Sequence, residues 1–374
     1  MIQIIAIGVL FFCLFFIQRQ LYTRLWEKGL YVTLSFGREH IWEGEQGELK
    51  EIIENRKRLP LSMLKVKFKT DRHLLFADQK GSRTTDQFYR NDVFRINGGE
   101  KVTRTLTFEG GIRGYYTIDS LTLVASDLFF TTQMVDDFPV HTSIYVYPKP
   151  FESAEFKRSL TQLNGEVLAR RHLLEDPFEY RGIREYQPYD DIKDINWKAT
   201  AKTGDLKVNQ KNYTSLKSVQ VFYNVEDDNI MKKEDCVEAS LRIVAGLCSF
   251  FLAQGIQVSC FGNALDGLTG EHMEITAKSG NGQLDTILRG LARLDLEKPV
   301  ADFTELFEEM LIKGQNGLLT CFVAPNQYED FLQLLQRYQD TGRDYVWFYP
   351  LNGKQEPELP SGISARVRFI HLDT

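Results

Sequence analysis

The chain has few cysteines and no excess of basic residues. Its 374 residues include 5 cysteines and 45 lysines and arginines against 51 aspartates and glutamates, for a formal net charge of −6. Five scattered cysteines without a C-x-x-C pair argue against a disulfide framework, a zinc ribbon or a redox dithiol, and a reducing compartment fits them best. A nucleic-acid-binding domain normally carries a basic footprint, so we expect no nucleic acid among the partners.

Several enzyme motifs are also missing. The chain has no G-x-x-x-x-G-K-[ST] loop, so it is not itself a P-loop ATPase, and it has neither G-x-S-x-G nor H-E-x-x-H. None of its six histidines lies three or four residues from another. Cys321 could suggest a thiol nucleophile, but its apolar neighbours Phe322 and Val323 favour a place in the core. We therefore expect no catalytic residues and no enzymatic activity.

One long hydrophobic run is present, at the start of the chain. Residues 2–17 contain a single polar side chain, Gln3. As a helix this run is about 24 Å long, and apolar residues up to Trp26 extend it toward the ~30 Å of a hydrocarbon core. A secretory signal peptide needs a basic n-region and a small-residue cleavage site, and both are missing. A lipoprotein box fails because Cys13 follows two phenylalanines, and a buried core helix fits so uniform a run poorly. We expect residues 1–28 to form a membrane anchor.

Charge predicts how this anchor is oriented. No lysine or arginine precedes the apolar run, whereas Arg19, Arg24 and Lys28 follow it. By the positive-inside rule, the N-terminus lies outside and everything after residue 28 lies in the cytoplasm. The expected localisation is therefore the cell membrane, with a single pass.

Residues 29–150 have the pattern of a β-domain. Glycine and asparagine clusters separate short runs in which apolar and polar residues alternate at period two, and no stretch shows a long helical period. Several short strands with such turns predict a β-sandwich-like domain. The clearest runs are 30–36, 63–68, 101–108, 115–124 and 143–147.

Residues 217–374 alternate strands with helices. The expected strands are 218–224, 256–262, 317–325, 344–350 and, at an edge, 365–372. An apolar stripe at helical spacing follows the first strand, and Gly255 stands where a C′ glycine belongs. Asn326 and Glu329 resemble a capping pair for a later helix. This order gives right-handed βαβ units, so we expect a three-layer, Rossmann-like α/β domain and an α+β multidomain chain overall.

The connector between these domains, 151–216, has a different character. Within 176–211 there are seven basic and seven acidic residues, interleaved with aromatic ones. Neither helix nor strand periodicity fits, and Pro177, Gly182 and Pro188 are expected to break any regular element. The run F-x-x-R-G-I-R-E-Y-x-P-x-D-D-I-K-x-I-N-W-K-A-T-A-K-T-G-x-L resembles the signature of the domain of unknown function 58 family. That bacterial and archaeal family is related to von Willebrand factor A-like proteins.

The resemblance extends over most of the chain. The N-terminal anchor, Asn55-Arg56-Lys57-Arg58-Leu59-Pro60, Arg113-Gly114-Tyr115-Tyr116 and Ile144-Tyr145-Val146-Tyr147-Pro148 are similar to features of the same family. It implies a von Willebrand A-like fold for 217–374. Members resemble partners of MoxR-type AAA+ ATPases, and no enzymatic activity is established for the family. The resemblance therefore implies a scaffold or adaptor.

The connector allows two interpretations. It is an Ω-like segment that packs the two domains together with its charges paired internally, or it is a docking surface. Exposed aromatic and charged groups are typical of interfaces, and the two interpretations are compatible. The candidate partner-binding residues are Arg181, Arg184, Tyr186, Asp190, Asp194 and Trp197.

The loop after the first expected strand of the α/β domain is acidic. A von Willebrand A domain binds Mg²⁺ there through a D-x-S-x-S loop, because a hard cation needs carboxylate and hydroxyl oxygens. In this chain Asn224 replaces the leading aspartate, and Glu226 and Asp228 replace the two serines. We expect no metal site of the usual kind and no cofactor. An acidic loop could still bind Mg²⁺ weakly, or it is a solvated turn.

Three functions follow from these patterns. The first is a membrane-anchored, non-catalytic adaptor whose A-like domain binds a MoxR-type AAA+ ATPase or other membrane or envelope proteins. The alternative is a metal-dependent hydrolase that uses Glu226, Asp227 and Asp228. The third is a cell-surface adhesion module, which requires the opposite membrane topology.

Overall fold

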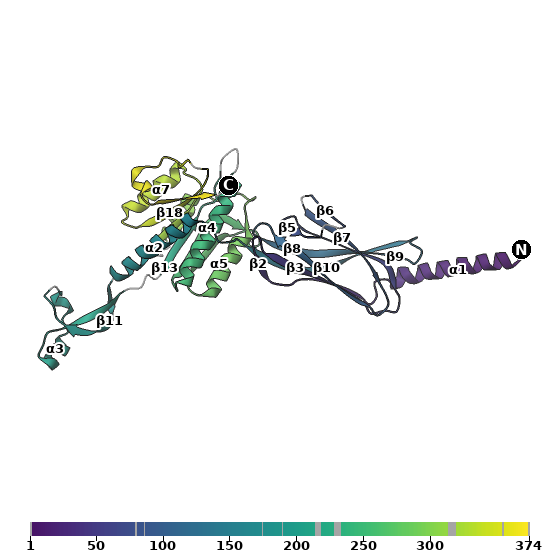
Figure 1. The fold of residues 1–374 in the computed structure, drawn as a ribbon, viewed down its shortest axis with the longest axis horizontal. Helices are drawn as coiled ribbons and strands as arrows, with labels where there is room; N and C mark the ends of the chain where they lie inside the picture. The colour runs from purple at the N-terminus through teal and green to yellow at the C-terminus, as the bar shows by residue number, and fades with distance from the viewer. Residues whose placement is uncertain are drawn as a thin grey trace. The chain divides into compact units, whose positions relative to one another are not determined.

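The computed structural model describes residues 2–78, 81–85, 87–173, 175–188, 190–213, 218–227, 233–312, 319–353 and 355–372. The chain divides into two compact units (Figure 1). The first unit comprises Met1–Lys149 with Leu291–Arg293, and the second comprises Pro150–Gly290 with Leu294–Thr374. The fold is mixed α and β with several sheets, as the change of sequence pattern along the chain predicts.

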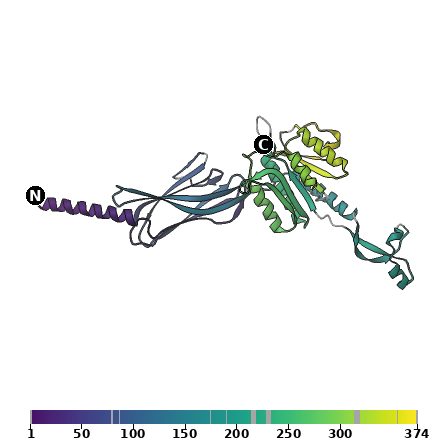
Figure 2. The ribbon, with the colours of Figure 1, turned by 180° about the vertical axis from the view of Figure 1, so that it is seen from behind.

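An apolar helix, α1 (Ile2–Leu25), begins the first unit. Both views show it projecting beyond the strands of this unit (Figures 1 and 2). Over Gln3–Leu25 its mean hydropathy is 2.1 and its most apolar window is unburied, so its length and composition match those of a membrane-crossing helix. The predicted N-terminal apolar helix is therefore present. A second helix, α4 (Glu234–Ala253), passes the same test but is 72% buried, as a core helix of a soluble domain is.

The last turn of α1 is held by the strands that follow it. Tyr22 and Trp26 are buried in the hydrophobic core of the first unit. The Tyr22 hydroxyl donates to the carbonyl of Pro60 (2.9 Å), and the Lys57 ammonium donates to the carbonyl of Trp26 (2.6 Å). Burial lowers the pKa of Lys57 to about 8. A cation such as the Lys57 ammonium is favourable at the C-terminal end of a helix. The last turn of α1 is thus packed into the β-domain.

Two sheets form the β-domain of the first unit. The four-stranded sheet has the order β1 (Leu30–Phe36), β3 (Gln46–Asn55), β8 (Lys101–Gly110) and β5 (Leu74–Phe76). The six-stranded sheet has the order β2 (His40–Trp42), β10 (Gln133–Tyr147), β9 (Gly114–Ser126), β4 (Leu61–Asp71), β7 (Gln87–Ile96) and β6 (Ser82–Thr84). All of these pairs are antiparallel except β2 with β10.

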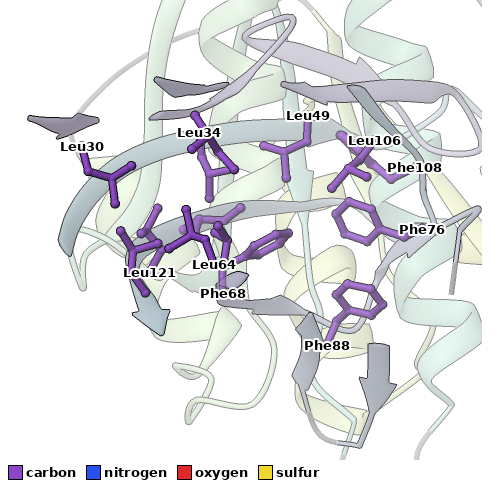
Figure 3. Packing of buried hydrophobic residues seen from close by; sticks show 14 of the residues in the cluster. Leu30, Leu34, Leu49, Leu64, Phe68, Phe76, Phe88, Leu106, Phe108 and Leu121 are labelled. Atoms are coloured by element: carbon purple, nitrogen blue, oxygen red, sulfur yellow. The ribbon is translucent and has the colours of Figure 1, made fainter. Parts of the chain in front are cut away.

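The two sheets enclose one hydrophobic core. Figure 3 shows Leu34, Leu49 and Leu106 of the four-stranded sheet pointing toward Leu64 and Phe68 of the six-stranded sheet. The alternate residues of β3 and β8 that point away from this core are exposed or half-buried, which is the period-two pattern of the sequence. Burial of this one face therefore fixes the register of the strands.

A charged cluster lies in the same interior. Arg90 of β7 is fully buried, and its guanidinium contacts the carboxylates of Asp92 (2.6 Å) and Asp78 (3.2 Å). Arg104 of β8 reaches across from the other sheet to Asp92 (2.7 Å) and Asp78 (2.8 Å). Glu51 of β3 is opposite Arg104 in the ladder and is 1% exposed. The two sheets are thus joined by ion pairs as well as by apolar contacts.

The second unit is built on a largely parallel sheet. Its path is β15 (His272–Lys278), β14 (Gln257–Asp266), β13 (Ser218–Tyr223), β17 (Leu319–Val323), β18 (Tyr345–Asn352) and β19 (Val367–Leu372), and β16 (Leu294–Asp295) pairs with β14. The four pairs from β14 through β13, β17 and β18 to β19 are parallel. β15 is an antiparallel edge strand that the sequence pattern did not indicate.

Helices contact both faces of this sheet. Phe222 of β13 and Phe322 of β17 make edge-to-face contacts with Phe307 of α6 (Phe303–Ile312), with ring centroids 4.7 and 5.1 Å away. Cys321 precedes Phe322 and therefore points to the opposite face, toward Cys248 of α4. The remaining helices are α2 (Ala154–Leu173), α5 (Asn281–Arg293), α7 (Glu329–Asp340) and α8 (Ser361–Ser364). Gly255 has a φ of +72°, as expected of the residue that ends α4.

The connector is not irregular, which corrects the expectation that no regular element would form within 176–211. β11 (Glu175–Glu185) pairs antiparallel with β12 (Lys207–Tyr213), and the 3₁₀ helix η1 (Ile192–Asp194) and α3 (Trp197–Thr203) lie between them. The two strands are joined by 21 residues, and register shifts interrupt their pairing. A search for periodicity within one segment does not detect such a pairing, because the partner strand is remote and the alternation is broken.

Candidate partner interface

The described residues of 182–208 form the end of the β11–β12 hairpin, here called the hairpin tip (Figure 1). Local capping explains its helical turn. The Asn196 side chain accepts a hydrogen bond from the Ala199 N–H (3.0 Å) and donates to the Asn209 side chain (2.6 Å). Gly204, with a φ of +83°, ends α3 and donates to the Thr200 carbonyl (2.9 Å). The I-N-W-K-A-T-A-K-T-G sequence thus encodes a capped helix.

A bidentate ion pair closes the turn that follows β11. The two terminal nitrogens of Arg184 lie 2.7 and 2.6 Å from the two carboxylate oxygens of Asp190. Asp190 also accepts the N–H of Gln187 (2.8 Å). The hydrogen bond from Arg184 holds the pKa of Asp190 below its ordinary value. These two candidate residues therefore bind each other and shape the turn.

The apolar side chains of the hairpin tip are exposed. Neither η1 nor α3 contains a buried residue. Trp197 is 64% exposed and Ile192 is 68% exposed, and Ile183 and Leu206 are also exposed. By contrast, Val208 of β12 is buried, with 3% of its surface exposed. Large apolar side chains held on a hydrogen-bonded frame and surrounded by charges are typical of protein interfaces.

Two of the other candidate residues lie on the same tip, and Arg181 directly precedes it. Tyr186 and Asp194 are half-buried, and the side chain of Arg181 lies outside the described residues. Lys207 contacts Glu185 (3.2 Å) and Lys193 contacts Asp191 (2.7 Å). Of the candidate residues expected to be exposed, Trp197 is exposed, whereas Arg184, Tyr186, Asp190 and Asp194 are half-buried. The candidates did not include the three exposed aliphatic residues, whose signal was apolar character in a charged segment without a period.

The loop after β13 lies where the carboxyl ends of the parallel strands meet. Asn224 is buried, and its side-chain oxygen accepts N–H groups from Glu226 (2.9 Å) and from the Asn263 amide (2.8 Å). The Asn263 oxygen in turn accepts the Val225 N–H (3.0 Å). The side-chain amide of Asn326 donates to the Glu226 carbonyl (2.8 Å). Three asparagines thus link the ends of β13, β14 and β17.

Glu226 uses both carboxylate oxygens within this network. One accepts the N–H of Phe303 at the start of α6 (2.7 Å), and the other accepts the amide of Asn224 (3.0 Å). The Asp227 carboxylate accepts the Lys233 N–H, and Asp228 lies outside the described residues. The Glu226 side chain acts as a helix-capping carboxylate. Within the described ranges, no group of three or more His, Cys, Asp or Glu side chains could hold a metal ion.

Asn326 does not cap α7, which corrects the capping pair expected with Glu329. α7 begins at Glu329 after Tyr328, without a side-chain cap. The Asn326 amide is directed instead to the Glu226 backbone. The capping motif did not identify this role of Asn326, because an asparagine side chain can form hydrogen bonds either with the N–H groups at a helix start or with the backbone of a neighbouring loop.

The cysteines are buried thiols apart from Cys13. Cys236, Cys248, Cys260 and Cys321 are all buried, as their apolar neighbours in the sequence indicate. Burial raises the pKa of Cys260 and of Cys321. A nucleophilic cysteine needs a lowered pKa and access to solvent, so neither of these thiols is poised to react.

A pocket of about 510 Å³ lies beside the first turn of α4. Its lining combines Lys233, Glu234 and Asp235 with apolar residues of the β17 and β18 ends. None of Asn224, Asn263 and Asn326 lines the pocket, but the Asp227 carboxylate accepts the N–H of the lining residue Lys233. Because its lining carries charges of both signs, the pocket favours neither an anion nor a cation.

Comparison with known proteins yields only weak similarity. No family model matches the chain, and no curated protein matches it. A non-cellulosomal cohesin from Archaeoglobus fulgidus is 12% identical over 31% of this chain and 90% of its own, with a TM-score of 0.21. A CARDB domain from Pyrococcus furiosus is 14% identical over 31% and 90%, with a TM-score of 0.20. Spo0M, a sporulation control protein from Bacillus subtilis, is 12% identical over 42% and 58%, with a TM-score of 0.18. Similarities at this level carry no argument about fold or function.

Proposed function

We propose that the chain is a membrane-anchored, non-catalytic adaptor that binds protein partners through its second unit. In this proposal residues 217–374 of the second unit form a three-layer, von Willebrand A-like domain. The first partner proposed is a MoxR-type AAA+ ATPase, and other membrane or envelope proteins are further candidates. α1 crosses the membrane once, with the N-terminus outside and everything after residue 28 in the cytoplasm.

The membrane part of the proposal is supported by α1 and the charges that follow it. The helix is apolar and exposed along the stretch that would meet lipid. Arg19 and Arg24 stand on its last two turns, and Lys28 follows directly. Because basic residues are retained on the cytoplasmic side, this asymmetry favours a cytoplasmic body.

The A-like assignment is supported by sheet order and by the position of one loop. Parallel strands with helices on both faces agree with that class, and the 224–228 loop follows the strand after which an A domain carries its metal-binding residues. The sequence resemblance to the family points the same way. In this chain the loop is used to link strand ends through Asn224 and Glu226.

The hairpin tip is the observation that carries the adaptor proposal. Trp197 and Ile192 remain more than half exposed although the frame beneath them is ordered by a bidentate ion pair and a capped helix. Exposing large apolar groups on a rigid support is costly unless a partner covers them. The surrounding arginine, lysine and aspartate side chains suit a polar interface rim.

Capture from membranes tests the proposal. The full-length tagged protein is solubilised in mild detergent, and the proteins that it retains are compared with those retained by a Trp197→Ala, Ile192→Ser variant. Removal of an aromatic anchor costs about 2 kcal/mol or more at an interface, so recovery of the ATPase should fall at least about tenfold. Quantitative mass spectrometry of the eluates gives the measurement.

The matched control is Leu268→Ala. Leu268 is 58% exposed, lies in the same unit and belongs to the turn between β14 and β15. Its replacement should leave recovery unchanged. Equal recovery by the tip variant, or no ATPase and no envelope protein with the unaltered chain, contradicts the proposal.

A further inference from the structure

The β9–β10 turn carries three adjacent exposed apolar residues. Leu128, Phe129 and Phe130 are 46%, 49% and 59% exposed. Here they are called the apolar loop. Among the described residues, Phe130 is the only one other than glycine with a positive φ (+59°). An aromatic residue rarely adopts this conformation, so the surrounding contacts must impose it.

Asp127 imposes the shape of the apolar loop. Its carboxylate accepts the N–H groups of Thr131 (2.7 Å) and Thr132 (3.1 Å) and the Thr131 hydroxyl (2.7 Å). The Phe130 N–H donates to the Asp127 carbonyl (3.1 Å). Asp127 itself is fully buried. The turn is therefore closed by its polar groups, and its three apolar side chains are left outside.

The apolar loop lies against the membrane helix. The Phe129 ring is 6.2 Å from that of Phe11 and 5.8 Å from that of Phe15. One turn further along, the Gln18 amide donates to the Asp127 carboxylate (3.0 Å). The contacts with α1 thus run from the polar residue at the boundary up into its apolar stretch.

Helix geometry converts these contacts into a depth. At 1.5 Å per residue, Phe15 lies about 6 Å and Phe11 about 12 Å above Arg19 along the axis of α1. Arg19 is the first charged residue after the apolar run. A side chain that touches Phe11 and Phe15 lies at the same level as these residues. If α1 spans a bilayer, Phe129 is then above the level of the boundary charge.

The side chains around the loop fit such a position. Below that level, Arg19, Arg24, Lys28, Arg56 and Arg58 are exposed around the end of α1. The Arg56 N–H donates to the Gly29 carbonyl (2.8 Å), which places that turn of the β-domain beside the helix end. Basic groups at headgroup level and phenylalanines above them are the arrangement of an interfacial membrane contact.

We propose that the apolar loop inserts into the lipid bilayer beside α1 and forms a second membrane contact of the β-domain. This inference rests on the membrane anchoring stated above. The occupant is lipid, because the loop continues the lipid-facing surface of α1 at the same depth. Two attachment points, α1 and the loop, then fix how the β-domain stands on the membrane.

Fluorescence from single labelled cysteines tests the insertion. Cys13 is exposed and the other four cysteines are buried, so a thiol-reactive NBD probe labels the unaltered chain at Cys13. A Cys13→Ser, Phe130→Cys variant carries the probe on the loop. A Cys13→Ser, Leu75→Cys variant is the control, since Leu75 is 52% exposed on β5 and pairs with Glu109 at the end of β8 remote from α1. Full-length proteins are reconstituted in vesicles that contain anionic phospholipid, and circular dichroism checks folding.

The expected result has two parts. The probe at position 130 emits at shorter wavelength than the probe at position 75, and it is quenched by phospholipids that carry a nitroxide near the glycerol end of the acyl chain. The probe at Cys13 is quenched more strongly by a nitroxide deeper in the chain.

Three results overturn the inference, and they are distinguishable. If the probe at 130 behaves like that at 75 while the one at Cys13 is quenched, the anchor holds and the loop does not insert. Short-wavelength emission at 130 without quenching means that protein, for instance a second copy, covers the loop. Absence of quenching at Cys13 removes the anchor itself, and the proposed function fails together with this inference.

Discussion

The interiors of the two units differ in how they treat charge. Among the described residues, the buried charged side chains of the first unit are Glu43, Glu51, Arg90, Asp92, Arg113 and Asp127. In the described part of the second unit, Asp266 is the only buried charged residue, and the space between its sheet and α6 and α7 is filled by aromatic rings. The first interior combines ion pairs with apolar packing, whereas the second relies on apolar packing. Their responses to pH and to substitution should differ accordingly.

The largest expected effect is that of Arg90→Ala. The substitution leaves Asp92 buried with Arg104 as its remaining partner, and breaking a buried pair costs about 3–5 kcal/mol. Hydrogen exchange of peptides from β7 and β8, read by mass spectrometry, measures the loss in the opening free energy of the first unit.

Phe307→Ala is the counterpart in the second unit. It should cost a similar 3–5 kcal/mol, but the loss should not depend on pH or salt, because only packing is removed. If both variants respond alike to pH and salt, the contrast between the two interiors is wrong.

The next effect concerns Glu51, whose carboxylate oxygens have no hydrogen-bond partner among the described residues. Burial, and then the charge of Asp92, raise the pKa of Glu51 to about 7 against the favourable charges of Arg104 and Arg90. Below its ordinary pKa the group is protonated in both folded and unfolded chains. As pH rises toward 7 the unfolded chain ionises first, so the first unit loses up to roughly 3 kcal/mol of stability.

Glu51→Gln should remove this loss. The melting temperature of the first unit, followed by scanning calorimetry at pH 5 and pH 8, should fall less with pH in the variant than in the unaltered chain. Glu54→Gln is the control, because Glu54 lies on the same strand, is more exposed and has a lowered pKa through its bond with Arg56. An unchanged slope for Glu51→Gln would show that the carboxyl is ionised in the folded state throughout.

The smallest effect comes from adding a buried charge to the second unit. Asn224→Asp replaces the amide that donates to Glu226 (3.0 Å) by a second carboxylate. The lost hydrogen bond and the repulsion should cost about 1–3 kcal/mol at pH 7. Mg²⁺ should recover part of this in the variant and leave the unaltered chain unaffected, as measured by the melting temperature with and without the cation.

Asn224→Ala separates the two causes of that loss. The substitution removes the hydrogen bond without adding charge, so the variant should be less stable than the unaltered chain, and its melting temperature should not change with Mg²⁺. Stabilisation of the unaltered chain by Mg²⁺ would instead favour the alternative of a cation site in the 224–228 loop.

Local patterns predicted much of the secondary structure, because the helical period of 3.6 residues and the strand period of two can each be detected within a single element. The apolar stripe of α4 and the alternation of β8 are examples. The sequence patterns did not predict β15 or the β11–β12 pair, because a short edge strand and a pairing across 21 residues have no local period. The inward charges of β7 were detectable in principle, because Arg90 and Asp92 share the parity of the buried Phe88.

The candidate site was predictable in part. Trp197 was selected as an exposed aromatic, but the ion pair between Arg184 and Asp190 makes those two residues part of the frame. Sequence alone could not assign these roles, because it does not show whether an arginine side chain binds a partner protein or a carboxylate of its own turn. The same limit applies to Asn326, whose bond to Glu226 depends on three strand ends that meet only in the fold.

The burial of Tyr22 and Trp26 has a practical consequence. Their side chains are 1% and 5% exposed and complete the core of the β-domain from the last turn of α1. A truncated, water-soluble form that begins at Gly29 would lose both aromatic residues and the carbonyl that accepts the Lys57 ammonium. Deleting a buried aromatic side chain costs about 3–5 kcal/mol, so such a fragment would unfold readily. A soluble form should instead begin near Gln20, so that the apolar run is removed and the packed turn is kept.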